Sequence, residues 1–137
     1  MSDVASRPAL PIVGSILRAP EMLSVLRILT GLMFLEHGTG KLLGFPPGLP
    51  FIDQMPPTLL YFTGTMELIG GFLVTIGLFT RPAAFILSGF MAFGYFMVHF
   101  PQSFFPAKNY GEAAVLFCFV FLYLAAVGSG PWAVRRD

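Results

Sequence analysis

The chain has 137 residues, of which 55% are hydrophobic and only 11% are charged, and its mean hydropathy is +0.77. A soluble domain is about 45–50% apolar and about a quarter charged, so this composition favours a single membrane-embedded domain over a soluble one. The net charge of +1 argues against nucleic-acid binding, and the single Cys118 excludes a disulfide within the chain.

Twelve prolines divide the chain and leave four long apolar stretches between them. Proline lacks a backbone donor and clashes inside a helix, so helices are expected between the prolines. Each stretch approaches or exceeds the roughly 20 residues that cross a bilayer. The sequence therefore predicts an all-α fold, a four-helix transmembrane bundle, with helices over residues 22–43, 58–79, 82–100 and 110–127.

The segments around these helices differ in character. Residues 1–20 are expected to form a cytoplasmic or interfacial N-terminal segment, residues 21–130 the transmembrane domain, and residues 131–137 a short basic tail. The first loop, residues 44–57, carries five prolines and is expected to be an ordered cap.

The arginines predict the orientation. With four spans, both termini and the turn at residues 80–82 share one side, and that side carries Arg7, Arg18, Arg81, Arg135 and Arg136. The opposite side carries only Lys41 and Lys108. By the positive-inside rule, both termini are cytoplasmic and the two longer loops face outward.

Five acidic or imidazole side chains lie within or at the rims of the apolar stretches: Glu36, His37, Glu67, His99 and Glu112. Such groups are costly in hydrocarbon and usually face a protein interior or a water-filled cavity. All five fall in the outer half of their predicted spans. We therefore expect helix packing to gather them around one cavity below the outer loops.

Glu67 is the sharpest of these signals. Its neighbours on the same helix face are Thr63, Gly64, Gly70 and Gly71, small residues that let another helix approach closely. The carboxyl is expected to point into a helix–helix seam. In one interpretation it forms a hydrogen bond that holds the helices together. In the other it is a catalytic group that, together with His37, donates or accepts a proton.

The remaining polar residues each have a structural and a functional interpretation. His37 and Lys41 are one turn apart and share a face, and Lys41 can snorkel to the interface. Glu112 fits a helix capping box with Asn109. His99 can be an interfacial hydrogen-bonding residue. The functional interpretation makes Glu36, Lys41, His99 and Glu112 ligand- or cofactor-binding residues of the same pocket.

The residues do not identify a cofactor. His37 and His99 could clamp a haem, but their spacing is not characteristic and no helix carries the Glu-x-x-His pair of di-iron bundles, so no metal site is predicted. Sixteen phenylalanines suit a flat apolar ligand such as a quinone, and they equally suit packing against lipid.

In combination, several stretches resemble the DoxX family of small membrane proteins (DoxX/DoxD-like). They are residues 26–28 with Gly31, Phe34, His37-Gly38 and Lys41-Leu42; residues 67–71 and 77–84; and residues 109–112 with 128–132. The resemblance implies a four-helix protein of the bacterial inner membrane. Relatives include the membrane subunit of a thiosulfate:quinone oxidoreductase, which implies a redox or quinone-linked role.

Three hypotheses follow. The first is a quinone-linked membrane subunit of an oxidoreductase, with the head group among His37, Glu67 and either Glu36 or His99. The second is a scaffold of a membrane complex or homo-oligomer, supported by the small residues Ala84, Ser88, Ala92, Gly64 and Gly71. The third is a transporter of a small solute or metal. The lipid bilayer is the partner common to all three.

Overall fold

A computed structural model describes residues 18–137 of the chain, and its helices follow the spacing of the prolines and glycines. The described elements are α2 (Ala19–Leu43), η2 (Ile52–Gln54), α3 (Pro57–Ile76), α4 (Thr80–Gly94), η3 (Tyr95–His99), α5 (Pro106–Asn109) and α6 (Glu112–Val127). No strand occurs within this part of the chain, so the all-α prediction is confirmed for it. The prediction for residues 1–17 lies outside the described residues.

Proline and glycine set the helix ends. Pro20 lies in the first turn of α2 and Pro57 is the first residue of α3, positions where the missing N–H costs nothing. Gly44 and Gly77 end these two helices in the left-handed conformation, with φ of 71° and 72°. A residue with a side chain adopts the left-handed backbone conformation only at a cost in conformational energy, so glycine is the residue that fits there.

Two helices have the length and apolar composition of a membrane span. They are α3 and the continuous run of α4 with η3, Thr80–His99, each 20 residues long. The helix α2 is longer, at 25 residues, but it carries both acidic and basic side chains. The helix α6 is apolar but has only 16 residues.

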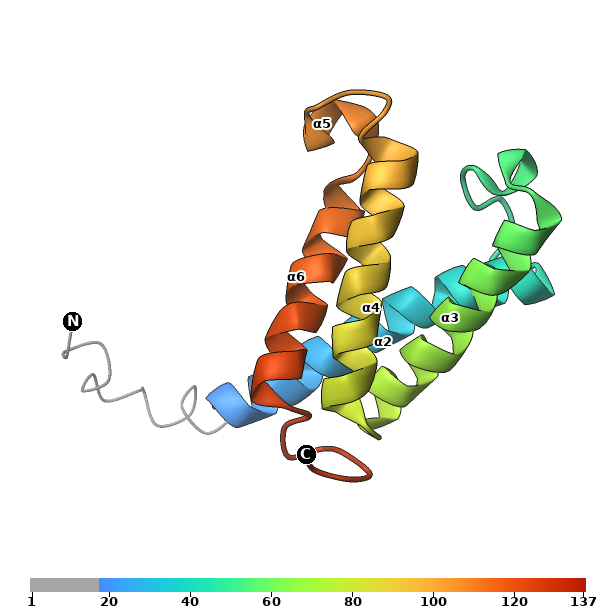
Figure 1. Ribbon diagram of the computed structural model, residues 1–137. Coiled ribbons are helices and arrows are strands. Elements are labelled where there is room, and N and C mark those ends of the chain that lie inside the picture. Colours follow the sequence, from blue (N-terminus) through green and yellow to red (C-terminus); the bar gives the residue numbers. More distant parts are fainter. Residues whose placement is uncertain (1–17) are drawn as a thin grey trace.

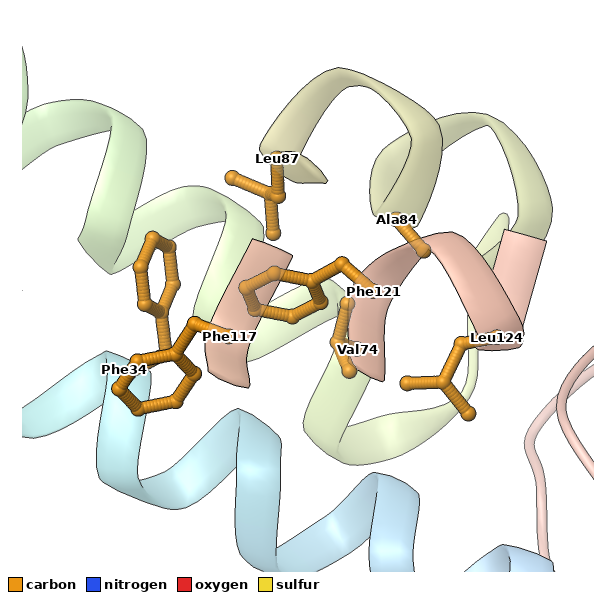
Figure 2. Close-up of a cluster of buried hydrophobic side chains, with 7 residues drawn as sticks. All are labelled: Phe34, Val74, Ala84, Leu87, Phe117, Phe121 and Leu124. Carbon is orange, nitrogen blue, oxygen red and sulfur yellow. The ribbon is translucent and has the colours of Figure 1, made fainter. Parts of the chain in front are cut away.

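The four long helices pack as two pairs, α2 with α3 and α4 with α6. Figure 1 shows the pairs close together where α3 turns into α4 and farther apart at the end that carries η2 and α5. A cluster of buried apolar side chains joins the pairs at the closed end (Figure 2). Its members are Phe34, Val74, Ala84, Leu87, Phe117, Phe121 and Leu124.

Glycine makes the contact between α2 and α3 unusually close. A Cβ added to Gly38 would lie 2.5 Å from the backbone nitrogen of Leu68, and one added to Gly71 would lie 2.7 Å from that of Leu35. These glycines therefore let the two helix backbones touch. Of the small residues predicted to form seams, Gly71 thus packs against a helix of the same chain, and Ser88 donates to the Cys118 carbonyl of α6 at 2.8 Å.

Arg27 forms hydrogen bonds that hold the molecule together at the end where α3 turns into α4. Its guanidinium is fully buried and donates to the carbonyls of Val74 and Thr75 at the end of α3, at 2.9 and 2.7 Å. It also donates to the carbonyls of Ser129, at 2.7 Å, and Trp132. The residues after α6 are therefore bound to the ends of α2 and α3, and the tail predicted at residues 131–137 is packed against the helices.

Candidate functional site

A pocket of about 340 Å³ lies between the two helix pairs and is lined by residues of η3 and of the loop around η2. It is therefore at the end of the molecule where the two pairs diverge (Figure 1). Its wall is built from α2, α3, α4 with η3, α6 and the loop before α3. Most of the lining is aliphatic or aromatic, including Phe34, Phe62, Phe90 and Phe117. A mostly apolar concavity with a few convergent polar groups is typical of a small-molecule site.

The loop between α2 and α3 covers part of this pocket. Leu49 packs onto Gly40 of α2, so the loop folds back over its own helix. Phe51 reaches the other helix pair, where its ring meets the His99 ring edge to face with centroids 6.3 Å apart. The loop is therefore an ordered cap, as its five prolines led us to predict. It contacts both helix pairs across the pocket.

An ion pair between α2 and α3 forms one wall of the pocket. Lys41 Nζ donates to Glu67 Oε1 at 2.8 Å and to Thr63 Oγ1 at 3.1 Å. The Lys41 and Glu67 side chains are only 11% and 9% exposed. Of the two interpretations of Lys41, the structural one, in which it snorkels to the interface, is wrong, because its ammonium is held inside the protein. The close contact of α2 with α3 brings a buried carboxylate within reach, which satisfies the ammonium inside the protein.

The second carboxylate oxygen of Glu67 has no partner. Oε2 is buried and accepts no hydrogen bond from any residue between 18 and 137, although Glu67 lines the pocket. A buried polar atom left unpaired is costly, and such atoms in native proteins often mark a ligand, an ion or a water molecule. Oε2 has almost no accessible surface, so the pocket meets other atoms of Glu67 and not this oxygen.

His37 lies one turn before Lys41 and also lines the pocket. Its ring packs edge to face against Phe117 of α6, with centroids 6.3 Å apart. Within residues 18–137 its ring nitrogens make no hydrogen bond, so they are available to a ligand. His37 and Glu67, the two residues predicted to be catalytic, therefore face the same space.

His99 lines the opposite wall, in the π-helical turn η3. Its Nδ1 lies 3.0 Å from the carbonyl oxygen of Asn109, and its ring stacks on Tyr95 with centroids 6.1 Å apart. Asn109 is fully buried and binds Tyr95, Ser103 and Gly111 through its side chain. This network fixes the His99 ring, and π-helical turns are frequent at functional sites.

Two of the predicted site residues lie elsewhere. Glu36 is exposed, because it lies about 100° round the helix from His37 and faces away from the pocket. Glu112 is exposed at the first position of α6 and does not line the pocket either. The predicted capping box is wrong: Gly111 is the N-cap, and the Asn109 side chain instead accepts from the Gly111 N–H. The structure therefore brings together His37, Lys41, Glu67 and His99, but not Glu36 or Glu112.

Sequence reasoning missed two residues of the site. Thr63 orients Lys41, and its position one turn before Glu67 was the available signal, since residues four apart share a helix face. The backbone carbonyl of Asn109 forms a hydrogen bond with the His99 ring, and no sequence pattern predicts this contact. Among residues 18–137, no three His, Cys, Asp or Glu side chains lie close enough to hold a metal ion.

The pocket fits the head group of a quinone or a similar single-ring amphipathic molecule. Its volume falls at the lower end of the roughly 300–1,000 Å³ of small-molecule sites. The apolar walls suit a hydrophobic ring and tail, and the Lys41–Glu67 ion pair and the His37 ring suit polar substituents. The residues present are therefore compatible with the predicted class of ligand.

Comparison with known proteins identifies related sequences. The sequence profile of the DoxX family matches residues 22–100, which span α2 through η3. An "Uncharacterized protein" of Haemophilus influenzae is 41% identical over 119 residues, which cover 84% of this chain and 89% of the relative.

Two more distant relatives carry descriptive names. "Inner membrane protein YqjF" of Escherichia coli is 27% identical over 122 residues, covering 82% of this chain and 88% of the relative. "Putative oxidoreductase CatD" of Bacillus subtilis is 39% identical over 59 residues, covering 42% of this chain and 44% of the relative. No solved structure matches the chain.

Proposed function

The chain belongs to the DoxX family of membrane proteins, and from this premise we propose that it is a quinone-linked membrane subunit of a redox system. The quinone head group occupies the pocket between the helix pairs. One observation carries the proposal: an apolar pocket is lined by the largely buried Lys41–Glu67 ion pair on one wall and by the oriented imidazole of His99 on another.

The chemistry of quinones suits these residues. Reduction of a quinone to a quinol takes up two electrons and two protons, so a quinone site needs groups that exchange protons in an apolar setting. Glu67 and His37 both face the pocket and are of the residue types that act as general acids and bases. Lys41 and His99 position the head group from the α2 wall and the η3 wall.

Electrons are supplied by a partner redox protein. The chain has one cysteine, so no thiol pair within it can carry them. The Bacillus subtilis relative bears the word oxidoreductase in its name, which supports a redox role for the chain. Three of the small residues that supported a scaffold role, Gly64, Gly71 and Ser88, instead make contacts within the chain.

In the proposed topology all four long helices cross the inner membrane and both termini are cytoplasmic. The length of α3 and of α4 with η3 supports two of the spans, and the name of the Escherichia coli relative supports the location. Arg18, Arg81, Arg135 and Arg136 lie at the end opposite α5, whereas Lys108 lies in α5. By the positive-inside rule the pocket then opens toward the outer face.

A matched pair of glycine substitutions tests the quinone site. Gly94 lines the pocket and Gly89 does not; both lie in α4, and a Cβ added at either meets nothing within 4 Å. Gly94→Leu should fill the pocket and Gly89→Leu should not. Equilibrium binding of a short-chain ubiquinone analogue to the purified protein in detergent is the measurement.

The expected result is binding by the wild type and by Gly89→Leu, and loss of binding by Gly94→Leu. The proposal fails if the wild type does not bind the analogue above the level of empty micelles. It also fails if both leucine variants bind as the wild type does, since the ligand would then lie outside this pocket.

A further inference from the structure

We propose that a second cavity, between α3 and α4, holds the apolar tail of the ligand whose head group occupies the first pocket. This inference rests on the proposed function and deepens it, because it makes the ligand a lipid-soluble quinone with a tail rather than a bare ring. The second cavity has a volume of about 200 Å³. It is lined by residues of α3 from Thr65 to Leu73 and of α4 from Ala83 to Leu87.

The walls of the second cavity are apolar. Among the described residues that line it, only Thr65 has a polar side chain, and its hydroxyl donates to the Tyr61 carbonyl of the same helix at 2.7 Å. Gly70 and Leu87 are both buried and form the inner wall, since a Cβ added to Gly70 would lie 2.6 Å from Leu87 Cδ2. The second cavity therefore suits a hydrocarbon chain better than a polar head group.

The outer edge of the second cavity is open to the surroundings of the protein. Ile69 of α3 and Ile86 of α4 line it and are 55% and 57% exposed. The helices that form it, α3 and α4 with η3, are also the two with the length and apolar composition of membrane spans. In the proposed topology these isoleucines meet lipid, so the second cavity is accessible to a hydrocarbon chain from the bilayer.

The second cavity adjoins the first pocket along the same two helix faces. Phe62 of α3 lines the first pocket, and Met66, one turn later, lines the second cavity. Phe90 of α4 lines the first pocket, and Ile86, one turn earlier, lines the second cavity. Both steps lead toward the turn that joins α3 to α4 (Figure 1). Residues four apart share a helix face, so a ligand can extend from the pocket into the cavity without crossing a helix.

Two aromatic rings mark the boundary between the pocket and the second cavity. The rings of Phe62 and Phe90 meet there, with centroids 6.5 Å apart. The Phe62 side chain is 58% exposed, so little packing within the protein holds its ring in place. The tail passes beside this ring, from the aromatic pocket that holds the head group into the aliphatic cavity.

Leucine substitutions separate the two parts of this site. In α4, Ala83 lines only the second cavity, Gly94 lines only the first pocket, and Gly89 lines neither. Ala83→Leu should therefore remove space for the tail, Gly94→Leu should remove space for the head group, and Gly89→Leu should remove neither. Thr65→Leu narrows the second cavity from the α3 wall.

The experiment measures the affinity of each purified variant for the tail-less ubiquinone head group and for a ubiquinone with a short isoprenoid tail. The tail partitions into detergent micelles, so each variant is compared with the wild type for the same ligand in the same detergent. Ala83→Leu should bind the tailed quinone at least about fivefold less tightly than the wild type, since an overfilled cavity is unfavourable. It should bind the head group as the wild type does. Gly89→Leu should bind both ligands normally, and Gly94→Leu should bind neither.

Each outcome decides a different claim. Unchanged binding of both ligands by Ala83→Leu overturns the tail site and leaves the head-group pocket standing, because the tail would then lie elsewhere. Equal weakening of both ligands also overturns the tail site, because the leucine would then disturb the pocket as a whole. Binding of neither ligand by the wild type overturns the proposed function itself. If Ala83→Leu does not fold, Thr65→Leu decides in its place by the same two criteria.

Discussion

Replacing Lys41 by methionine should destabilise the protein strongly, because it removes one member of a buried ion pair. Methionine keeps the length and apolar stem of lysine and removes only the charge and its three donors. In the native protein those donors reach Glu67 Oε1 and Thr63 Oγ1, and the two charged side chains are 11% and 9% exposed. The substitution therefore leaves Glu67 buried with neither oxygen paired.

The expected loss of unfolding free energy follows from that geometry. Removing one partner of a buried, hydrogen-bonded ion pair typically costs about 3–5 kcal/mol. Replacing both partners by apolar residues of similar size is often close to neutral, since no buried charge is left behind. The double variant Lys41→Met with Glu67→Met should therefore lose less stability than Lys41→Met alone, with a coupling energy of at least about 2 kcal/mol.

Unfolding by sodium dodecyl sulfate in mixed micelles, followed by circular dichroism, measures these differences. Lys108→Met is the matched control, since Lys108 is exposed in α5 and should tolerate the change within about 0.5 kcal/mol. The reasoning is refuted if Lys41→Met is as stable as Lys108→Met. It is equally refuted if the losses of the two single variants simply add in the double variant, because the pair would then not act as a unit.

Two further predictions concern the fold that supports the site, and the same unfolding assay measures both. Arg27→Met should lose about 3 kcal/mol or more, because the carbonyls of Thr75, Ser129 and Trp132, which are buried or partly buried, lose their only described donor at about 1–3 kcal/mol each. Arg18→Met, which changes an exposed side chain, should be nearly neutral. Equal stability of these two variants would contradict the role of Arg27. Gly38→Ala should cost about 1–3 kcal/mol, since its Cβ would lie 2.5 Å from the backbone nitrogen of Leu68. Gly89→Ala, whose Cβ meets nothing, should be neutral or slightly stabilising, and the reverse order would rule out the close α2–α3 contact.

The positions of the helices could be predicted from the sequence because hydrophobicity and backbone chemistry act locally. Proline fixes helix starts through its own φ preference, so the start of α3 at Pro57 was predicted to within one residue. The end was predicted at residue 79 and is wrong, because Gly77 ends the helix in the left-handed conformation. Local reasoning failed at the start of α6, where Asn109 was expected to be the cap. There the Asn109 side chain binds Tyr95 and Ser103, contacts that only the packed structure provides.

Some of the residues that line the site could be predicted from the sequence. The 3.6-residue helix period places His37 and Lys41 on one face and Glu36 on another, but it does not say which face meets the pocket. The glycines next to Glu67 indicated that this carboxyl lies in a tight seam, and it is indeed buried. Its partner across the seam is Lys41, 26 residues earlier in the chain. This pairing depends on how α2 crosses α3 and could not be predicted from the sequence.

The sequence by itself therefore determined the helices, their apolar character and the burial of Glu67, since each depends on a residue and its near neighbours along the chain. The tertiary structure decided which polar groups meet: it joined Lys41 to Glu67, turned His37 and His99 toward one pocket, and left Glu36 and Glu112 on the surface. The physical reason is that contacts between helices depend on their crossing and rotation, which are set by packing over the whole chain.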